Sequence, residues 1–460
     1  MMFKKKLLAS AMATALVSGA MMAGGAQAVT MSNTSVGQML LGDMYVARTT
    51  DYSTTAIRVI NTSTTDAVKA KLVFRSKKHS DECRDMILYL TPGDVAYVDV
   101  RLNATTGQPE VWSDDDSILA SKKSDGTAVF ASQVAGGVAF PMVAPRTEPA
   151  ADTCAQGHFE VVAAYAVGGT VTNLLSGLPN VTITQGMSKH NLIRVFDTPK
   201  EAATGSAELN VPANNITNNA VANGADFTAR VRLKGNVEIK SGSDRLMAPM
   251  LAIREGTNAR SGGVSTDVVT NPAFDVTLGA ETFIGSAFGD GGVQPTEMLG
   301  DIEGALTTNK LFNSYEKSAT NFEVTFPTKY RHILTGRYSG AGATYEAPFE
   351  VKGEVAYGVS LFDNQERSAP GTVADLCVVS PCSTPVVSGM YLIHEVNFEA
   401  VLGNTNWDPA SGWFNMTLAN RAGTDSYGYT WVSGIGAPAS GYTHFYKSPL
   451  AQSVISPMGR

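Results

Sequence analysis

Few residues in this sequence have the type and spacing to do chemistry, and the densest group is acidic. Asp114, Asp115 and Asp116 lie between two serines in a polar stretch that predicts a loop. Calcium binds several oxygen ligands on one flexible loop, so these carboxylates are weak calcium candidates. The D-x-[DN]-x-[DN]-G spacing is absent from the stretch, which favours a solvated acidic loop. We therefore predict no metal site.

No catalytic motif accompanies this loop. Residues 285–289 contain the residue types of a nucleophile elbow but not its spacing. The sequence has no phosphate-binding loop, no G-x-G-x-x-G and no H-E-x-x-H. Its six histidines are scattered, and nothing singles out two carboxylates as an acid–base pair. We predict that the protein is not an enzyme and has no cofactor, with an envelope hydrolase as a second alternative.

The four cysteines predict disulfides. They are Cys83, Cys154, Cys377 and Cys382, and an even number in an exported chain indicates two bridges. Cys377 and Cys382 most simply close a local loop, which leaves Cys83 to pair with Cys154. Four cysteines allow three connectivities, so this pairing is a preference among them.

Aromatic residues are concentrated near the C-terminus. Trp413 and Trp431 belong to this stretch and are candidates for a platform on which a glycan could stack. Such residues more often pack a closing sheet or an interface, because they bury large apolar surfaces. Both interpretations stay open at this point.

The N-terminal 28 residues have the three parts of a cleavable secretory signal peptide. Lys4, Lys5 and Lys6 precede an apolar run, and Ala26-Gln27-Ala28 forms a small-x-small cleavage site. The first cysteine is Cys83, so a lipid-anchored product is not expected. We predict an exported protein, placed outside the cell or on its outer surface, with the periplasm as the alternative.

The rest of the chain excludes two classes of partner. No later stretch is apolar for the roughly 20 residues that a spanning helix needs, so we predict no integral membrane segment in the mature chain. The formal net charge is −7 and becomes more negative when the lysines of the leader are removed. An acidic surface repels phosphate backbones, so nucleic acid is a poor partner.

Alternating apolar and polar residues recur along the mature chain and predict an all-β fold. Val68, Ala70, Leu72 and Phe74 alternate with charged residues, and residues 96–102 and 227–234 repeat the pattern. We predict an immunoglobulin-like β-sandwich over residues 29–190. A larger antiparallel sandwich of jelly-roll type is predicted over residues 191–460. Helices are expected to be few and short, near 295–306 and 309–318.

Three sequence blocks carry a resemblance. They are IRVINTSTTDAVKAKLVFRS at 57–76, LTPGDV at 90–95 and TFPTK at 325–329. Together they resemble a group of exported, largely uncharacterised β-sandwich proteins of Gram-negative bacteria. The resemblance implies a location in the cell envelope or outside the cell, and it brings no catalytic residues with it.

These observations predict a secreted or cell-surface structural protein, a subunit of a surface layer or an extracellular filament that assembles with its own copies. An adhesin that binds surface glycans is the first alternative. The segment 29–47 contains apolar residues, among them Met39 and Leu41, and could be a strand donated to a neighbouring subunit. Pairing of this segment within its own chain is the favoured interpretation.

Overall fold

The computed structural model describes most of the N-terminal half of the chain and separate strands of the C-terminal half. The described residues up to residue 255, which we call the first half, are 29–31, 34–47, 54–76, 82–122, 127–143, 154–171, 179–197, 231–241 and 244–255. Those of the second half are 310–316, 320–325, 333–335, 344–345, 355–365, 391–393, 396–397, 411–419, 423–424, 430–431, 440–445 and 453–454. The predicted signal peptide and the predicted helix at 295–306 lie outside the described residues, as do Cys377 and Cys382.

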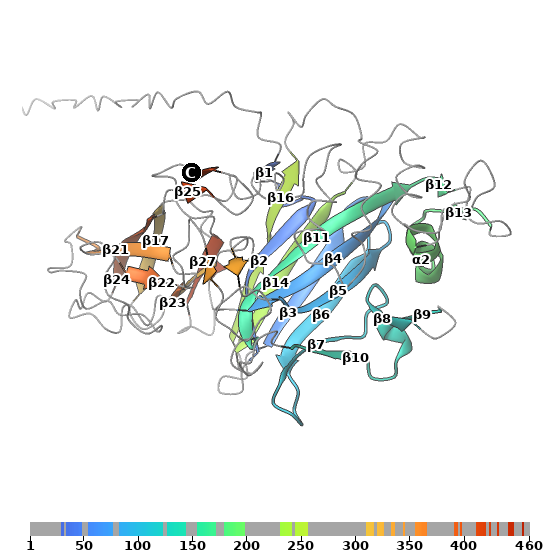
Figure 1. The fold of residues 1–460 in the computed structure, drawn as a ribbon, viewed down its shortest axis with the longest axis horizontal. Coiled ribbons are helices and arrows are strands. Elements are labelled where there is room, and N and C mark those ends of the chain that lie inside the picture. Colours follow the sequence, from blue (N-terminus) through green and yellow to red (C-terminus); the bar gives the residue numbers. More distant parts are fainter. Residues whose placement is uncertain are drawn as a thin grey trace, which may run out of the picture.

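The first half contains two six-stranded antiparallel sheets (Figure 1). Sheet A has the order β1 (Val29–Met31), β16 (Leu251–Glu255), β2 (Met39–Val46), β11 (Gln156–Gly168), β4 (Asp66–Ser76) and β5 (Glu82–Leu90). Sheet B has the order β10 (Val138–Pro141), β7 (Pro109–Ser113), β6 (Val95–Leu102), β3 (Thr54–Asn61), β14 (Leu233–Ser241) and β15 (Asp244–Pro249).

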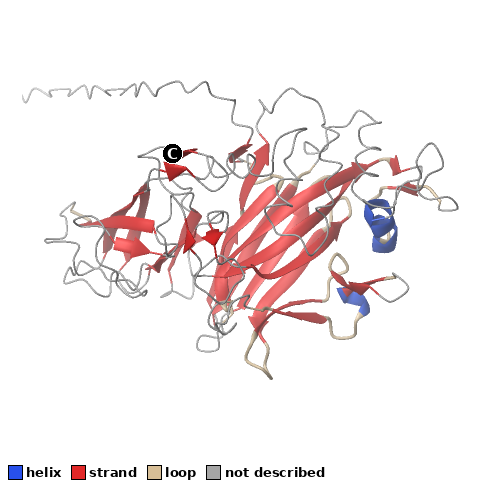
Figure 2. Ribbon diagram, in the orientation of Figure 1, coloured by secondary structure: helices blue, strands red, loops and turns tan. Residues whose placement is uncertain are grey.

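One buried hydrophobic cluster joins the two sheets. From sheet A it takes the alternate residues Val68, Ala70, Leu72 and Phe74 of β4, and from sheet B it takes residues such as Val98 of β6. Side chains alternate between the two faces of a strand, so a period of two places one set of apolar residues in the core. The predicted all-β class is confirmed, since strands dominate the described residues (Figure 2).

Strands that are distant in sequence complete both sheets. β14 pairs along its length with β3, and β16 lies between β1 and β2. These strands come after residue 190, where we predicted a domain boundary. The boundary itself stays a prediction, but hydrogen-bonded sheets extend across it.

The second half contains two four-stranded antiparallel sheets among its described residues. The first has the order β17 (Lys310–Glu316), β24 (Ser411–Ala419), β21 (Val355–Asp363) and β22 (Tyr391–Ile393). The second has the order β23 (Val396–Asn397), β18 (Thr320–Thr325), β27 (Ser440–Phe445) and β28 (Ser453–Val454). The helix predicted at 309–318 is wrong, because β17 pairs with β24 along its whole length and so satisfies its backbone in a sheet.

The remaining elements are short pairs and one α-helix. The pairs are β8 (Leu119–Lys122) with β9 (Ala128–Phe130), β12 (Thr170–Val171) with β13 (Val181–Thr182), β19 (Ile333–Thr335) with β20 (Thr344–Tyr345), and β25 (Gly423–Thr424) with β26 (Thr430–Trp431). A 3₁₀ turn, η1 (Ala131–Gln133), follows β9. The α-helix of the described residues is α2 (Lys189–Asp197), and no described helix has the length and apolarity to cross a membrane.

Candidate functional site

A tight turn between β5 and β6 fixes the first group of the candidate site, the carboxylate of Asp94. Gly93 takes the left-handed conformation at φ 72° that this turn needs, which glycine adopts without a steric cost. The backbone N–H of Thr91 donates to Asp94 Oδ2 at 3.0 Å, and the Thr91 hydroxyl donates to the same oxygen at 3.1 Å. The L-T-P-G-D sequence therefore builds a turn that orients its own aspartate.

The acidic loop after β7 supplies the second group. Asp115 Oδ2 accepts a hydrogen bond from the backbone N–H of Tyr97 at 3.1 Å, and Asp115 Oδ1 accepts one from that of Ser117 at 2.7 Å. The Ser117 hydroxyl donates to Asp94 Oδ2 at 3.3 Å. Asp115 thus anchors the loop to β6, and Ser117 connects the loop to the turn.

Lys189, the first residue of α2, completes the cluster. Its ammonium donates to the Asp94 carboxylate, to the Ser117 hydroxyl at 3.0 Å and to the carbonyl oxygen of Tyr89 at 3.1 Å. Asp116 Oδ1 lies 3.7 Å from the same nitrogen. The side chain of Lys189 is only 7% exposed and that of Asp94 is 18% exposed, while that of Asp116 is 61% exposed.

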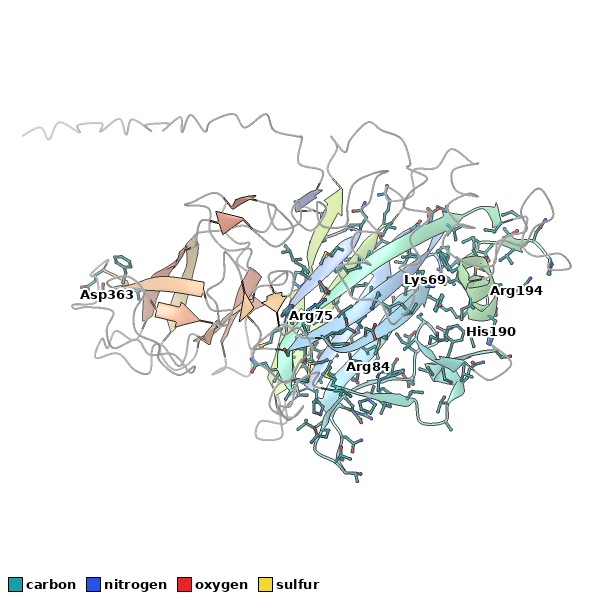
Figure 3. All side chains as sticks on the ribbon, viewed as in Figure 1. Lys69, Arg75, Arg84, His190, Arg194 and Asp363 are labelled. Carbon is teal, nitrogen blue, oxygen red and sulfur yellow. A yellow bond between two sulfur atoms is a disulfide. The ribbon has the colours of Figure 1, made fainter. Side chains whose placement is uncertain are left out.

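Apolar and polar contacts of α2 hold Lys189 in place. Leu192, Val195 and Phe196 are buried at the spacing of one helical face. The Phe196 ring lies 6.4 Å from the Tyr89 ring between centroids, and His190 Nε2 lies 3.1 Å from a carbonyl oxygen of β9. Figure 3 shows His190 and Arg194 on α2 beside the edge of sheet A. This apolar spacing is the signal in the sequence that would have predicted the helix.

Burial acts to raise the pKa of both partly buried carboxyls of the cluster, but neighbouring charges act in opposite directions on the two. Burial acts to raise the pKa of Asp94, but the charge and hydrogen bond of Lys189, with the turn's backbone hydrogen bonds, lower that pKa overall. Burial raises the pKa of Asp115, to which the charges of Asp116 and Asp94 add, against hydrogen bonds from Ser117. The cluster is a partly buried set of carboxyls around one ammonium.

The three weak calcium candidates do not converge. Both carboxylate oxygens of Asp115 accept backbone hydrogen bonds, whereas Asp114 and Asp116 are exposed. Within the part of the chain that the structure describes, no three His, Cys, Asp or Glu side chains are grouped to hold a metal ion. The cation that faces this loop is the Lys189 ammonium.

The predicted pairing of Cys83 with Cys154 is confirmed. Their sulfurs are bonded, the Cα atoms lie 5.9 Å apart, and both residues are buried. The bridge ties β5 to the segment directly before β11.

The other predicted site residues lie apart from the cluster. Trp413 lies on β24 and Trp431 on β26, which belong to different sheets. Met39 and Leu41 lie on β2, are buried, and pair with β11 and β16 of their own chain. Whether the segment that contains them is donated to a neighbouring subunit stays a prediction.

A second set of buried charges, which the sequence pattern does not predict, lies on the face of sheet A opposite the core. Arg75 Nε lies 2.8 Å from Glu160 Oε1, and both side chains are at most 1% exposed. Lys71 Nζ lies 2.6 Å from Asp85 Oδ2, with the lysine fully buried. Figure 3 labels Arg75 and Lys69 on β4 within this sheet. The alternation of β4 predicts which face these residues occupy but not their burial.

No protein-family model, curated protein or solved structure matches this chain. The candidate site is therefore described by its own geometry.

Proposed function

We propose that the protein is a secreted or cell-surface structural protein, a subunit that assembles with its own copies into a surface layer or an extracellular filament. The predicted signal peptide supports export, and the Cys83–Cys154 bridge suits an oxidising compartment. The single observation that carries the assembly is the position of β1 at the edge of sheet A.

β1 follows directly after the predicted cleavage site at Ala28, and among the described strands it pairs on one side only. Its three residues have Glu255, Arg254 and Ile253 of β16 as register partners. An edge strand presents unpaired backbone groups, and strand addition at such an edge is a common mode of association. β2 is flanked on both sides by strands of its own chain. β1, rather than Met39 or Leu41 of β2, is therefore the segment that we propose is exchanged between copies.

A disulfide that pins β1 to its own chain tests this proposal. Thr30 and Arg254 are register partners, so the double variant Thr30→Cys, Arg254→Cys can lock the strand when oxidised. We expect the wild-type secreted protein to form regular polymers in negative-stain microscopy. The oxidised variant should stay monomeric, and the same variant after reduction should polymerise as the wild type does.

Two results would overturn the proposal at different levels. Polymerisation of the oxidised variant would rule out exchange of β1 while leaving the structural role. A wild-type protein that is strictly monomeric at high concentration would rule out the structural role. Glycan binding by that monomer, lost on replacing Trp413 or Trp431, would then favour the adhesin alternative.

A further inference from the structure

Lys189 and Asp94 form an ion pair between α2 and the β5–β6 turn. An amine and a carboxyl group from distant parts of the chain, 95 residues apart, are held in direct contact inside the protein. Lys189 is more than nine-tenths buried, and its remaining donors are used by Ser117 and Tyr89. The nitrogen therefore has a fixed position against one carboxyl group.

The geometry points to an intramolecular amide bond between Lys189 Nζ and Asp94 Cγ, an isopeptide cross-link that joins α2 to the β5–β6 turn. Two reacting groups held in contact within one chain can have an effective concentration of ~10⁵ M or more. A condensation that is slow between separate molecules can therefore proceed unaided within a fold. The turn holds Asp94 through Thr91, and α2 holds Lys189 through its buried apolar face.

The reaction balances without a further reactant. A proton moves along the hydrogen bond from the Lys189 ammonium to the Asp94 carboxylate, which gives a neutral amine and a carboxylic acid. The nitrogen lone pair attacks Cγ and forms the C–N bond. One C–O bond of the carboxyl group then breaks, and that oxygen leaves as water after it takes a proton from the nitrogen. Ammonium and carboxylate become an amide and one water molecule.

Two neighbours are placed to assist these proton movements. The Ser117 hydroxyl accepts from Lys189 and donates to Asp94 Oδ2, so it touches both reacting groups. Asp116 Oδ1 lies 3.7 Å from the amine nitrogen, within ion-pair distance, so its carboxylate can act as a base toward that nitrogen. A second carboxyl group thus lies where a proton must travel from nitrogen to the leaving oxygen.

Burial favours the product. A buried ion pair pays a desolvation cost for both charges, which their attraction repays only in part. The amide carries no charge, so the condensation removes this cost and releases a water molecule to the solvent. Burial also acts to raise the pKa of Asp94, in the direction of the neutral acid, although the Lys189 charge outweighs it in the ion-paired state.

Mass spectrometry of the full secreted chain tests the cross-link directly. After reduction of the disulfides, we expect the intact mass to be lower by one water molecule than the mass of the sequence without its signal peptide. Tryptic digestion should leave the bond after Lys189 uncut and yield a branched peptide that contains Lys189 and Asp94. The variants Lys189→Arg and Asp94→Ala should lose the water deficit completely.

A matched control separates this effect from a general one. Lys234, on β14, is exposed, and the Lys234→Arg variant should keep both the water deficit and the branched peptide. A wild-type chain with the full sequence mass and a linear, cleavable Lys189 peptide would overturn the proposal and leave an ion pair. This result needs no variant, so it holds even if Asp94→Ala fails to fold.

Discussion

Sheets A and B share one core, yet their outer faces differ. On sheet A, the outward Arg75 and Glu160 are almost completely buried as an ion pair. On sheet B, the outward Arg58 is 36% exposed and pairs with Glu238 at 3.4 Å, while Arg101 is 39% exposed and pairs with Glu110 at 3.0 Å. The same alternation of residue types thus gives a covered face on one sheet and a partly wet face on the other.

The difference shows that a charged residue in a strand does not by itself predict that its side chain is exposed to solvent. Antiparallel sheets commonly leave one face wet, and sheet B follows that pattern. On sheet A, β18 and β27 of the second half contact β2. Charges that lose water must find partners, and Lys71 and Arg75 do so with Asp85 and Glu160.

The largest expected effect tests whether the buried pair of sheet A is a structural requirement. Replacing Glu160 with Ala removes the carboxylate beside Arg75 and leaves the guanidinium of Arg75 buried without this partner. We expect this variant to lose about 3–5 kcal/mol of unfolding free energy, as is typical when one partner of a buried ion pair is removed. Urea unfolding followed by circular dichroism measures the change.

A double variant gives the matching control. Arg75→Met with Glu160→Leu replaces both charges by apolar groups, and such replacements of buried pairs are often neutral or stabilising. We expect it to recover most of the lost stability. If Glu160→Ala cost no more than Arg58→Ala on sheet B, the difference between the two faces would have no energetic meaning.

The second prediction concerns the disulfide, which belongs to sheet A alone. Its two cysteines are 71 residues apart in the chain, so the bridge restricts a long loop in the unfolded state. We expect Cys83→Ser with Cys154→Ser to cost about 3 kcal/mol, the middle of the range for native bridges. Thermal unfolding measures it, with Cys377→Ser, Cys382→Ser as the matched variant. A loss below the experimental error would show that sheet A is held without the bridge.

Much of this fold could be predicted from the sequence, because its local patterns agree with the tertiary structure. The alternation in β4 gave the correct core residues, and the cysteine count with loop spacing gave the Cys83–Cys154 pair. The pairing of β14 with β3 could not be predicted, because no local pattern specifies which distant strand will be the neighbour of β3 in the sheet. The burial of Lys71 was missed for the same reason.

Only part of the candidate site could be predicted from the sequence. The sequence pattern singles out the acidic loop and makes Asp115 a weak calcium candidate, but its oxygens accept hydrogen bonds from backbone N–H groups of β6 and the loop. Lys189 was missed, because its role depends on a helix that starts 95 residues after Asp94. The contact between them is a property of the tertiary fold and leaves no short motif.

The third prediction concerns Asp115, at the loop that connects sheet B to the cluster. Burial raises the pKa of its carboxyl above the ordinary 3.8. The Asp115 carboxyl therefore ionises at a lower pH in the unfolded chain than in the folded protein. The free energy of unfolding falls as the pH rises from about 3.8 toward the raised pKa of the folded protein. The side chain of the Asp115→Asn variant cannot ionise, so the stability of this variant should not show that decrease with pH. Denaturant midpoints measured across acidic pH give both curves, and parallel curves would contradict the raised pKa.

The smallest expected effect lies on the outer face of sheet B. Arg58 is partly exposed, and Glu238 has a second partner in Arg245 at 3.0 Å, so Arg58→Ala leaves Glu238 paired. We expect a loss of at most about 1 kcal/mol, as for exposed ion pairs. Part of it comes from the guanidinium that lies 5.4 Å from the centroid of the Tyr97 ring. At 1 M salt the screening length between exposed charges is about 3 Å. Urea unfolding with and without 1 M salt should therefore show that the loss of unfolding free energy in Arg58→Ala becomes smaller with salt. The loss in Glu160→Ala should stay the same. Equal salt sensitivity of the two variants would mean that both faces are solvated alike.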